Sequence, residues 1–143
     1  MKIILPFCFL FLLFVNCDDN EDSSIAALDC NEVACTEVFI TLNVSVRDAS
    51  GVAIPLDRFE VIDKGSSEDI TIELDADSMQ MAQESGNYPL YNDLFVDGNQ
   101  NTKRTLVFKG YIDDDPVATA EYLIDTDCCH VDLESGEADI IIN

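Results

Sequence analysis

The 143-residue sequence contains no tryptophan, only one histidine and very few basic residues. Seven Lys and Arg stand against 29 Asp and Glu, which gives a formal net charge of −22. Contacts to phosphates need Lys and Arg, so this balance argues against nucleic acid as a partner. Without Trp the chain has no indole on which a sugar ring could stack, and a single His leaves few groups for acid–base catalysis.

The chain also lacks an apolar run long enough to span a membrane, although 48% of its residues are apolar and argue against disorder. Its apolar run at residues 3–15 is interrupted only by Pro6 and follows Lys2. A membrane-spanning helix needs about 20 such residues. A basic start before a short apolar region is typical of a secretory signal peptide, which we expect at residues 1–16.

Cys17 is separated from this apolar run only by Asn16, and four acids follow it: Asp18, Asp19, Glu21 and Asp22. A Cys at this place resembles the lipobox of bacterial lipoproteins, and the acids resemble the surface-export signal of lipoproteins in the Bacteroidota. The resemblance implies that Cys17 carries palmitate, that residues 17–28 form an acidic tether, and that the exported protein is anchored in the outer membrane, exposed at the surface. The alternative is an ordinary cleaved signal peptide followed by a chance Cys.

Alternating apolar and polar residues predict β-strands throughout residues 29–143, which we expect to form one domain. The first strand, 38–46, places Val38, Ile40, Leu42, Val44 and Val46 on one face. Further strands are predicted at 59–62, 69–74, 88–95, 104–112 and 116–124, and a last hairpin at 127–133 and 138–142. Residues 75–85 predict a loop or one or two helical turns ended by Gly86. Seven or eight short strands without a long helix predict an all-β fold, an antiparallel β-sandwich.

A family resemblance lies in the first strand and the turn after it, from Val38 to Pro55. Transthyretin-like, carboxypeptidase-regulatory-like β-sandwich modules open with an alternating strand, Asp-x-x-Gly (here Asp48 and Gly51), a small apolar group and Pro. The resemblance implies a non-catalytic sandwich, Ig-like or transthyretin-like, on a secreted or surface protein. The whole chain also resembles small Bacteroidota lipoproteins with a late Cys-Cys-His.

Four cysteines lie in the predicted domain: Cys30, Cys35, Cys128 and Cys129. An even count in a small exported domain favours disulfides. Two of the three connectivities join the start of the domain to its last hairpin, and the third pairs the adjacent Cys128 and Cys129 in a strained ring. Because neighbouring strand residues point to opposite faces, we expect Cys129 to face the core and Cys128 to face solvent.

Two other chemistries are open to these cysteines. With His130 they offer five soft ligands for zinc, although structural zinc sites usually use Cys-x2-Cys spacing. A Cys–His nucleophile is disfavoured, since His130 and Cys129 are adjacent on a predicted strand and point apart. We expect His130 to be an exposed strand residue.

A predicted loop gathers four oxygen-bearing side chains that could bind calcium: Asp93, Asp97, Asn99 and Asn101. The 97/99/101 spacing resembles the start of an EF-hand loop, but Thr102 stands where the pattern needs Gly and Phe108 where it needs Glu. The loop therefore predicts weak calcium binding or ordinary solvated turn residues. No other cofactor is predicted.

These features predict a non-catalytic, membrane-tethered binding or structural module with an unknown protein or glycan partner. The alternatives are a calcium-dependent adhesion or glycan-accessory lipoprotein, and a small hydrolase whose carboxylate pair does not stand out among so many acids. Binding is expected at the loops around residues 75–87 and 92–103, which carry or adjoin Met79, Met81, Tyr88, Tyr91 and Phe95. The competing interpretation for the aromatic residues is packing in the core.

Overall fold

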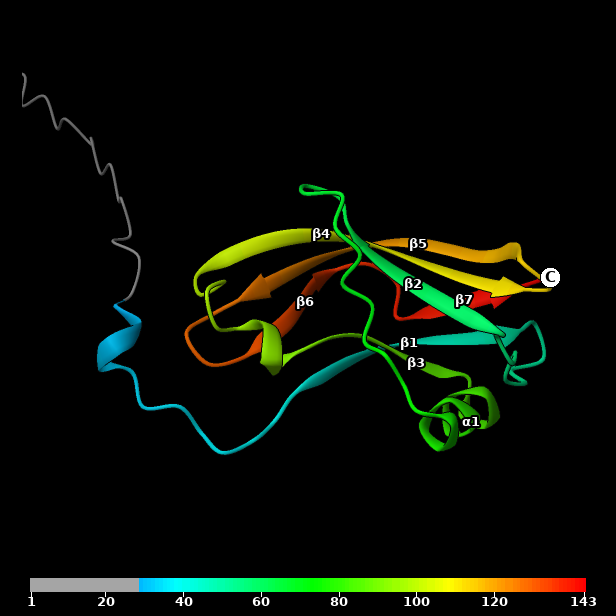
Figure 1. Cartoon of the computed structure of the whole chain (residues 1–143), viewed down its shortest axis with the longest axis horizontal. Helices are drawn as coiled ribbons and strands as arrows, with labels where there is room; N and C mark the ends of the chain where they lie inside the picture. Colours follow the sequence, from blue (N-terminus) through cyan, green and yellow to red (C-terminus); the bar gives the residue numbers. More distant parts are fainter. Residues whose placement is uncertain (1–28) are drawn as a thin grey trace, which may run out of the picture.

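A computed structural model describes residues 29–143, so residues 1–28, with the expected signal segment and Cys17, lie outside the described residues. Seven strands in this part of the chain form two sheets (Figure 1). The sheet order is β3–β1–β7 in one and β2–β4–β5–β6 in the other. The strands are β1 (Thr41–Asp48), β2 (Arg58–Asp63), β3 (Asn87–Asn92), β4 (Thr102–Ile112), β5 (Asp115–Thr126), β6 (Val131–Ser135) and β7 (Asp139–Ile142). The predicted all-β sandwich is confirmed.

The core lies between the two sheets and consists of the inward faces of alternating strands. Leu106 and Phe108 of β4 are fully buried, as their alternation predicts, and so is Ile124 of β5. The rings of Phe59 and Phe108 stack with centroids 6.0 Å apart. Period-two patterning is therefore sufficient to place the long β4–β5 hairpin, because one face of each strand is apolar throughout.

The predicted last hairpin is wrong, because β6 and β7 lie in different sheets. β6 pairs with β5, whereas β7 runs parallel to β1, with Val46 opposite Ile140. The chain crosses between the sheets at Gly136, which has a φ of +123°. A Cβ there would lie 2.5 Å from the Tyr122 ring, so only glycine fits this crossing.

Residues 69–74 are extended but do not form the predicted third strand, and only Asp69 makes an isolated bridge to β2. The backbone N–H of Ile70 donates to Val61 O at 2.9 Å. Beyond that bond, the Thr71 hydroxyl accepts from the Val61 N–H at 2.7 Å, while Asp69 Oδ1 accepts from the Thr71 N–H at 3.0 Å. Side chains thus replace the backbone partners that a continued ladder requires.

The segment after it forms helix α1 (Ala76–Ser85), which is longer than the one or two turns expected. Asp75 caps its start by accepting from the Ser78 N–H at 2.8 Å, and Gly86 ends it in the left-handed conformation, as predicted. A Cβ on Gly86 would lie 2.8 Å from Val46 O, so the helix end packs directly on β1. No helix among residues 29–143 is long and apolar enough to cross a membrane.

Candidate functional site

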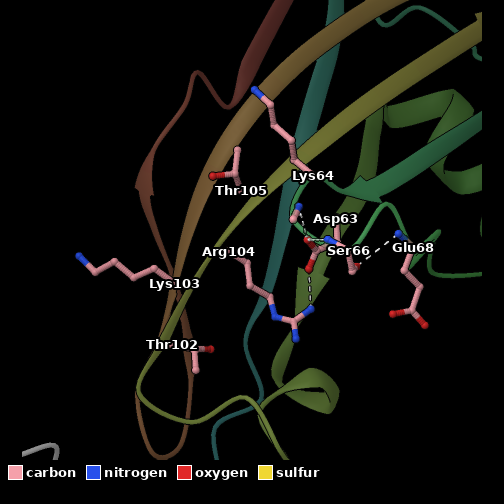
Figure 2. A pocket seen from close by; sticks show the side chains of 9 residues that line it. Asp63, Lys64, Ser66, Glu68, Thr102, Lys103, Arg104 and Thr105 are labelled. Atoms are coloured by element: carbon pink, nitrogen blue, oxygen red, sulfur yellow. Dashed lines mark hydrogen bonds and ion pairs between the residues drawn. The ribbon is translucent and has the colours of Figure 1, made fainter.

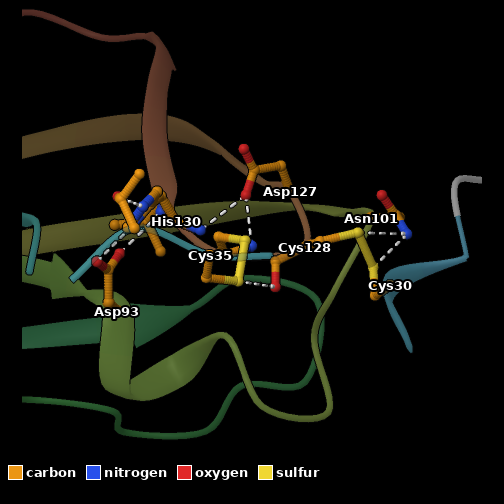
Figure 3. The surroundings of a disulfide bond; sticks show 10 residues. Cys30, Cys35, Asp93, Asn101, Asp127, Cys128 and His130 are labelled. Carbon is orange, nitrogen blue, oxygen red and sulfur yellow. Dashed lines mark hydrogen bonds and ion pairs between the residues drawn. A yellow bond between two sulfur atoms is a disulfide. The ribbon is translucent and has the colours of Figure 1, made fainter. Parts of the chain in front are cut away.

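Residues 29–40, here called the N-terminal arm, lie outside both sheets and lead into β1 (Figure 1). The arm contains one short 3-10 helix, η1 (Cys30–Glu32), and no strand. Two disulfides, Cys30–Cys128 and Cys35–Cys129, join it to the turn between β5 and β6 (Figure 3). Both bridges follow the expected joining of the 30/35 pair to the 128/129 pair, and the connectivity that the sequence left open is thereby defined.

The two adjacent cysteines face the opposite way from the prediction. Cys128 is buried with 7% of its surface exposed, whereas Cys129 is only half-buried. The prediction failed because residues 127–130 form a turn and not a strand, so strand alternation does not apply. Asp127 Oδ1 holds the turn by accepting from the backbone N–H groups of Cys129 at 2.6 Å and His130 at 2.7 Å.

His130 is not the exposed strand residue that the sequence predicts, because it links the arm to the sandwich. Its Nδ1 lies 2.8 Å from Asp93 Oδ2, and its Nε2 lies 2.9 Å from Thr36 Oγ1 (Figure 3). A carboxylate only accepts hydrogen bonds, so Nδ1 donates to Asp93, and Nε2 of a neutral ring then accepts from the Thr36 hydroxyl. The sequence gives no sign of this contact, since Asp93 and His130 come from distant, irregular segments.

Asp93 is the centre of this connection and begins the second 3-10 helix, η2 (Asp93–Phe95). Its carboxylate accepts from the backbone N–H groups of Ile40 at 2.8 Å and Val131 at 3.0 Å, besides His130. Burial acts to raise the pKa of Asp93, but the hydrogen bonds from His130 and the two backbone groups outweigh it and hold the pKa below its ordinary value. The ionised carboxylate therefore fastens the end of the arm, β6 and His130 at one point.

Three of the four residues expected to bind calcium, Asp93, Asn99 and Asn101, have other partners in the structure. Both oxygens of Asp93 face the donors described above. The Asn99 amide donates to Phe95 O at 2.7 Å and its oxygen accepts from Arg104, while Asn101 Nδ2 lies 3.1 Å from Cys30 Sγ. Among residues 29–143 no group of three or more His, Cys, Asp and Glu side chains is placed to hold a metal ion. Calcium binding at this loop stays a prediction.

A hollow of about 600 Å³ opens between the turn after β2 and the start of β4 (Figure 2). It is lined by Lys64, Lys103 and Arg104, which are three of the six basic residues in the described part of the chain (seven in the whole chain, less Lys2). Lys64 pairs with Glu121 at 2.8 Å and Lys103 with Glu134 at 2.6 Å. Figure 2 shows the two lysines pointing away from Arg104 in different directions, so the three cations do not converge on one ligand position.

Arg104 stands at the inner end of this hollow and joins three segments. Its Nη1 lies 2.6 Å from Asp63 Oδ2, and its Nη2 donates to Asn99 Oδ1. Asp63 is 5% exposed, and its other oxygen accepts from the backbone N–H groups of Gly65 at 2.8 Å and Ser66 at 3.2 Å. The sequence did not predict this network, although a charged residue at an inward position of an otherwise apolar strand is a signal for a buried pair. The ion pair joins parts of the fold, and each of the three cations that line the hollow is already paired with a carboxylate and not with an external anion.

The loops expected to bind a partner divide into buried and exposed residues. Tyr88 and Tyr91 are fully buried, the Phe95 ring stacks on Tyr91 at 4.6 Å, and Met79 packs against the core while half-buried. Met81 alone among the five is exposed, with 69% of its surface accessible. The aromatic residues thus pack in the core, as the competing interpretation states. Met81 on helix α1 remains as the exposed candidate for contact with a partner.

No protein-family model, curated protein or solved structure matches this chain.

Proposed function

We propose that this protein is a non-catalytic binding or structural module tethered to a membrane through its N-terminus. The observation that carries the proposal is the double covalent attachment of the arm, because the arm is where the expected tether of residues 17–28 enters the domain. A pull on the tether reaches Cys30 first and passes through Cys128 into the turn between β5 and β6. The load therefore bypasses β1, which would otherwise be peeled from its sheet.

The Asp93–His130–Thr36 chain has the order of an acid, a base and a hydroxyl, which invites comparison with a hydrolase. Its surroundings favour a structural role. Attack by a hydroxyl on a carbonyl builds negative charge on oxygen, which needs nearby donors. The hollow of about 350 Å³ beside His130 is lined by three carboxylates, Asp125, Asp127 and Asp132. The backbone N–H groups of Cys129 and His130 already donate to one of them.

The tether is tested by growing the source cells with labelled palmitate and isolating the protein. The wild type is expected to carry the label, and Cys17→Ser is expected to lose it. Cys8→Ser is the matched control, because it also removes a thiol from the N-terminal segment and is expected to keep the label. Label retained by Cys17→Ser contradicts the proposed anchor.

The non-catalytic assignment is tested with a panel of ester, amide and glycoside substrates. The wild type is expected to show no turnover above that of the buffer. Turnover that disappears in Thr36→Val or His130→Ala would overturn the assignment and identify the hydroxyl chain as a catalytic site. Turnover that survives both changes would overturn it in favour of a carboxylate site.

A further inference from the structure

A shallow groove of about 320 Å³ lies where helix α1 meets β1 and β3 of the three-stranded sheet. Four of its eight lining residues are apolar, and the other four carry hydroxyl or amide groups. The lining residues are Asn43, Leu74, Ser78, Met81, Ala82, Ser85, Asn87 and Pro89. The groove is thus built from one face of the helix and the outward side of two neighbouring strands.

The groove lining carries no charge in a chain in which 25% of the residues are charged. The helix contributes Ser78, Met81, Ala82 and Ser85, which follow one another at intervals of three, one and three residues and so form a single stripe. Met81 lies at the rim with 69% of its surface exposed, while Ala82 beside it is buried at 6%. A flexible thioether over a small apolar floor can adapt to an incoming apolar side chain.

Acids border this neutral surface on the helix. Asp77 lies four residues before Met81 and Glu84 three residues after it, so both share its side of the helix. Both carboxylates are exposed, and the helix has no basic residue. The nearby Arg47 is turned to the end of the helix, where its guanidinium donates to Ser85 O at 3.0 Å and Gly51 O at 3.2 Å. The groove therefore pairs an apolar centre with a negative border.

We propose that this groove binds an extended peptide segment of a partner protein in which an apolar side chain lies between two basic residues. The apolar side chain fills the hollow between Met81 and Pro89, and the basic residues contact Asp77 and Glu84. The charge of this border is complementary to such a segment and repels acidic ones. The proposal rests on the proposed function in one respect, since it names the surface and the partner class of the binding module.

The test uses the purified full chain and the peptide Gly-Lys-Gly-Leu-Gly-Lys-Gly-amide, which carries an uncharged fluorophore on its N-terminal amine. Binding is followed by fluorescence anisotropy in 150 mM NaCl, a salt concentration of about physiological strength. Met81→Ser is expected to raise the Kd at least tenfold by the rough scale of one lost apolar side chain. The double variant Asp77→Asn/Glu84→Gln is expected to weaken binding similarly. Val52→Ser is the matched control, since Val52 is an exposed apolar residue (60%) outside the groove and its loss should leave the Kd unchanged.

Three results would overturn the proposal. If Met81→Ser and Val52→Ser bind the peptide with equal affinity, or if a peptide with Ser in place of Leu binds as well as the original, then non-specific charge alone accounts for binding. A concentration-dependent dimer in sedimentation that Met81→Ser abolishes assigns the groove to a second copy of the chain instead. Because Cys17 takes no part in this assay, failure of the peptide test leaves the tether proposal standing, and failure of the palmitate test leaves the groove assignment standing.

Discussion

The arm and the sandwich are held by opposite means. The sandwich has 16 buried core side chains, and neither disulfide joins one of its sheets to the other. The arm has both disulfides, yet only its last residue, Ile40, packs against the core. Val38 and Phe39 of the arm remain exposed at 64% and 56%. Covalent bonds thus occur where apolar burial is scarce, and disulfides commonly compensate for a small core in small domains.

This division separates two effects of the disulfides. In the folded protein they fasten the arm to the turn at residues 127–130. In the unfolded chain the bridge between Cys30 and Cys128 closes a loop with a sequence separation of 98, which lowers its entropy. In the chain-entropy model, closing such a loop adds about 4–5 kcal/mol to the free energy of unfolding. Reduction should therefore lower the global stability without removing any contact of the core.

Among single substitutions, the largest expected effect comes from breaking the sandwich alone. Phe108→Ala removes a fully buried ring between the sheets and should cost about 3–5 kcal/mol of the free energy of unfolding, because the cavity cannot collapse completely. Urea unfolding measures this loss, and a count of free thiols should show both bridges still formed. Val52→Ala, at an exposed apolar residue, is the control and should change stability by less than about 0.5 kcal/mol. Equal effects of the two changes would contradict the assigned core.

A smaller loss is expected from the polar end of the sandwich. Arg104→Met leaves Asp63 buried without its cation and should cost about 2–3 kcal/mol, less than for a fully buried pair because the Arg104 side chain is 29% exposed. Adding Asp63→Asn removes the unpaired charge, so the double variant should recover part of the loss in urea unfolding. A double variant as unstable as the sum of the two single changes would show that the pair is not coupled.

The smallest effect concerns the hydrogen-bonded attachment of the arm. Asp93→Asn can accept from only one of the two backbone donors of Ile40 and Val131, and should cost about 1–2 kcal/mol. The pKa of Asp93 is lowered in the folded protein, so the stability that it contributes is present above the unfolded pKa of about 3.9 and is lost as the pH falls through the folded value. Urea unfolding of both proteins between pH 6 and pH 2 checks this. The difference between them should shrink with acid, and a constant difference would contradict it.

The sequence predicted those parts of the fold that depend on local pattern. The faces of β4 and β5 followed from Leu106, Phe108 and Ile124, and the end of α1 followed from Gly86. Which strands pair was harder to predict. β7 pairs with β1 and not with β6, the strand that precedes it in the sequence, and the alternation of residues along β7 would be the same in either sheet. The sequence predicts strand at residues 127–130 only by extending the alternation of Val131, Asp132 and Leu133 backwards, and the Asp127 carboxylate turns the chain there instead.

The candidate sites were predictable to a smaller extent. The joining of Cys30 and Cys35 to Cys128 and Cys129 was predictable from the even number of cysteines together with the expected export. The Asp93–His130 contact spans 37 residues and the Arg104–Asp63 contact 41, and neither is visible without the fold. In so acidic a chain, the sequence does not distinguish Asp63 and Asp93 from the other Asp residues, and only the fold shows that these two are shielded from solvent.

The central claim is that the disulfides fasten the arm to a sandwich that its own core holds together. The most direct test is nitrogen-15 relaxation of the full chain at 25 °C, before and after reduction of both bridges. The account predicts that order parameters of residues 31–38 fall from about 0.85 to below about 0.6. Chemical shifts in the second half of β4 and the first half of β5, far from the bridges, should stay in place. Loss of the β4 and β5 signals together with those of the arm would contradict it, because the sandwich would then depend on the bridges for its fold.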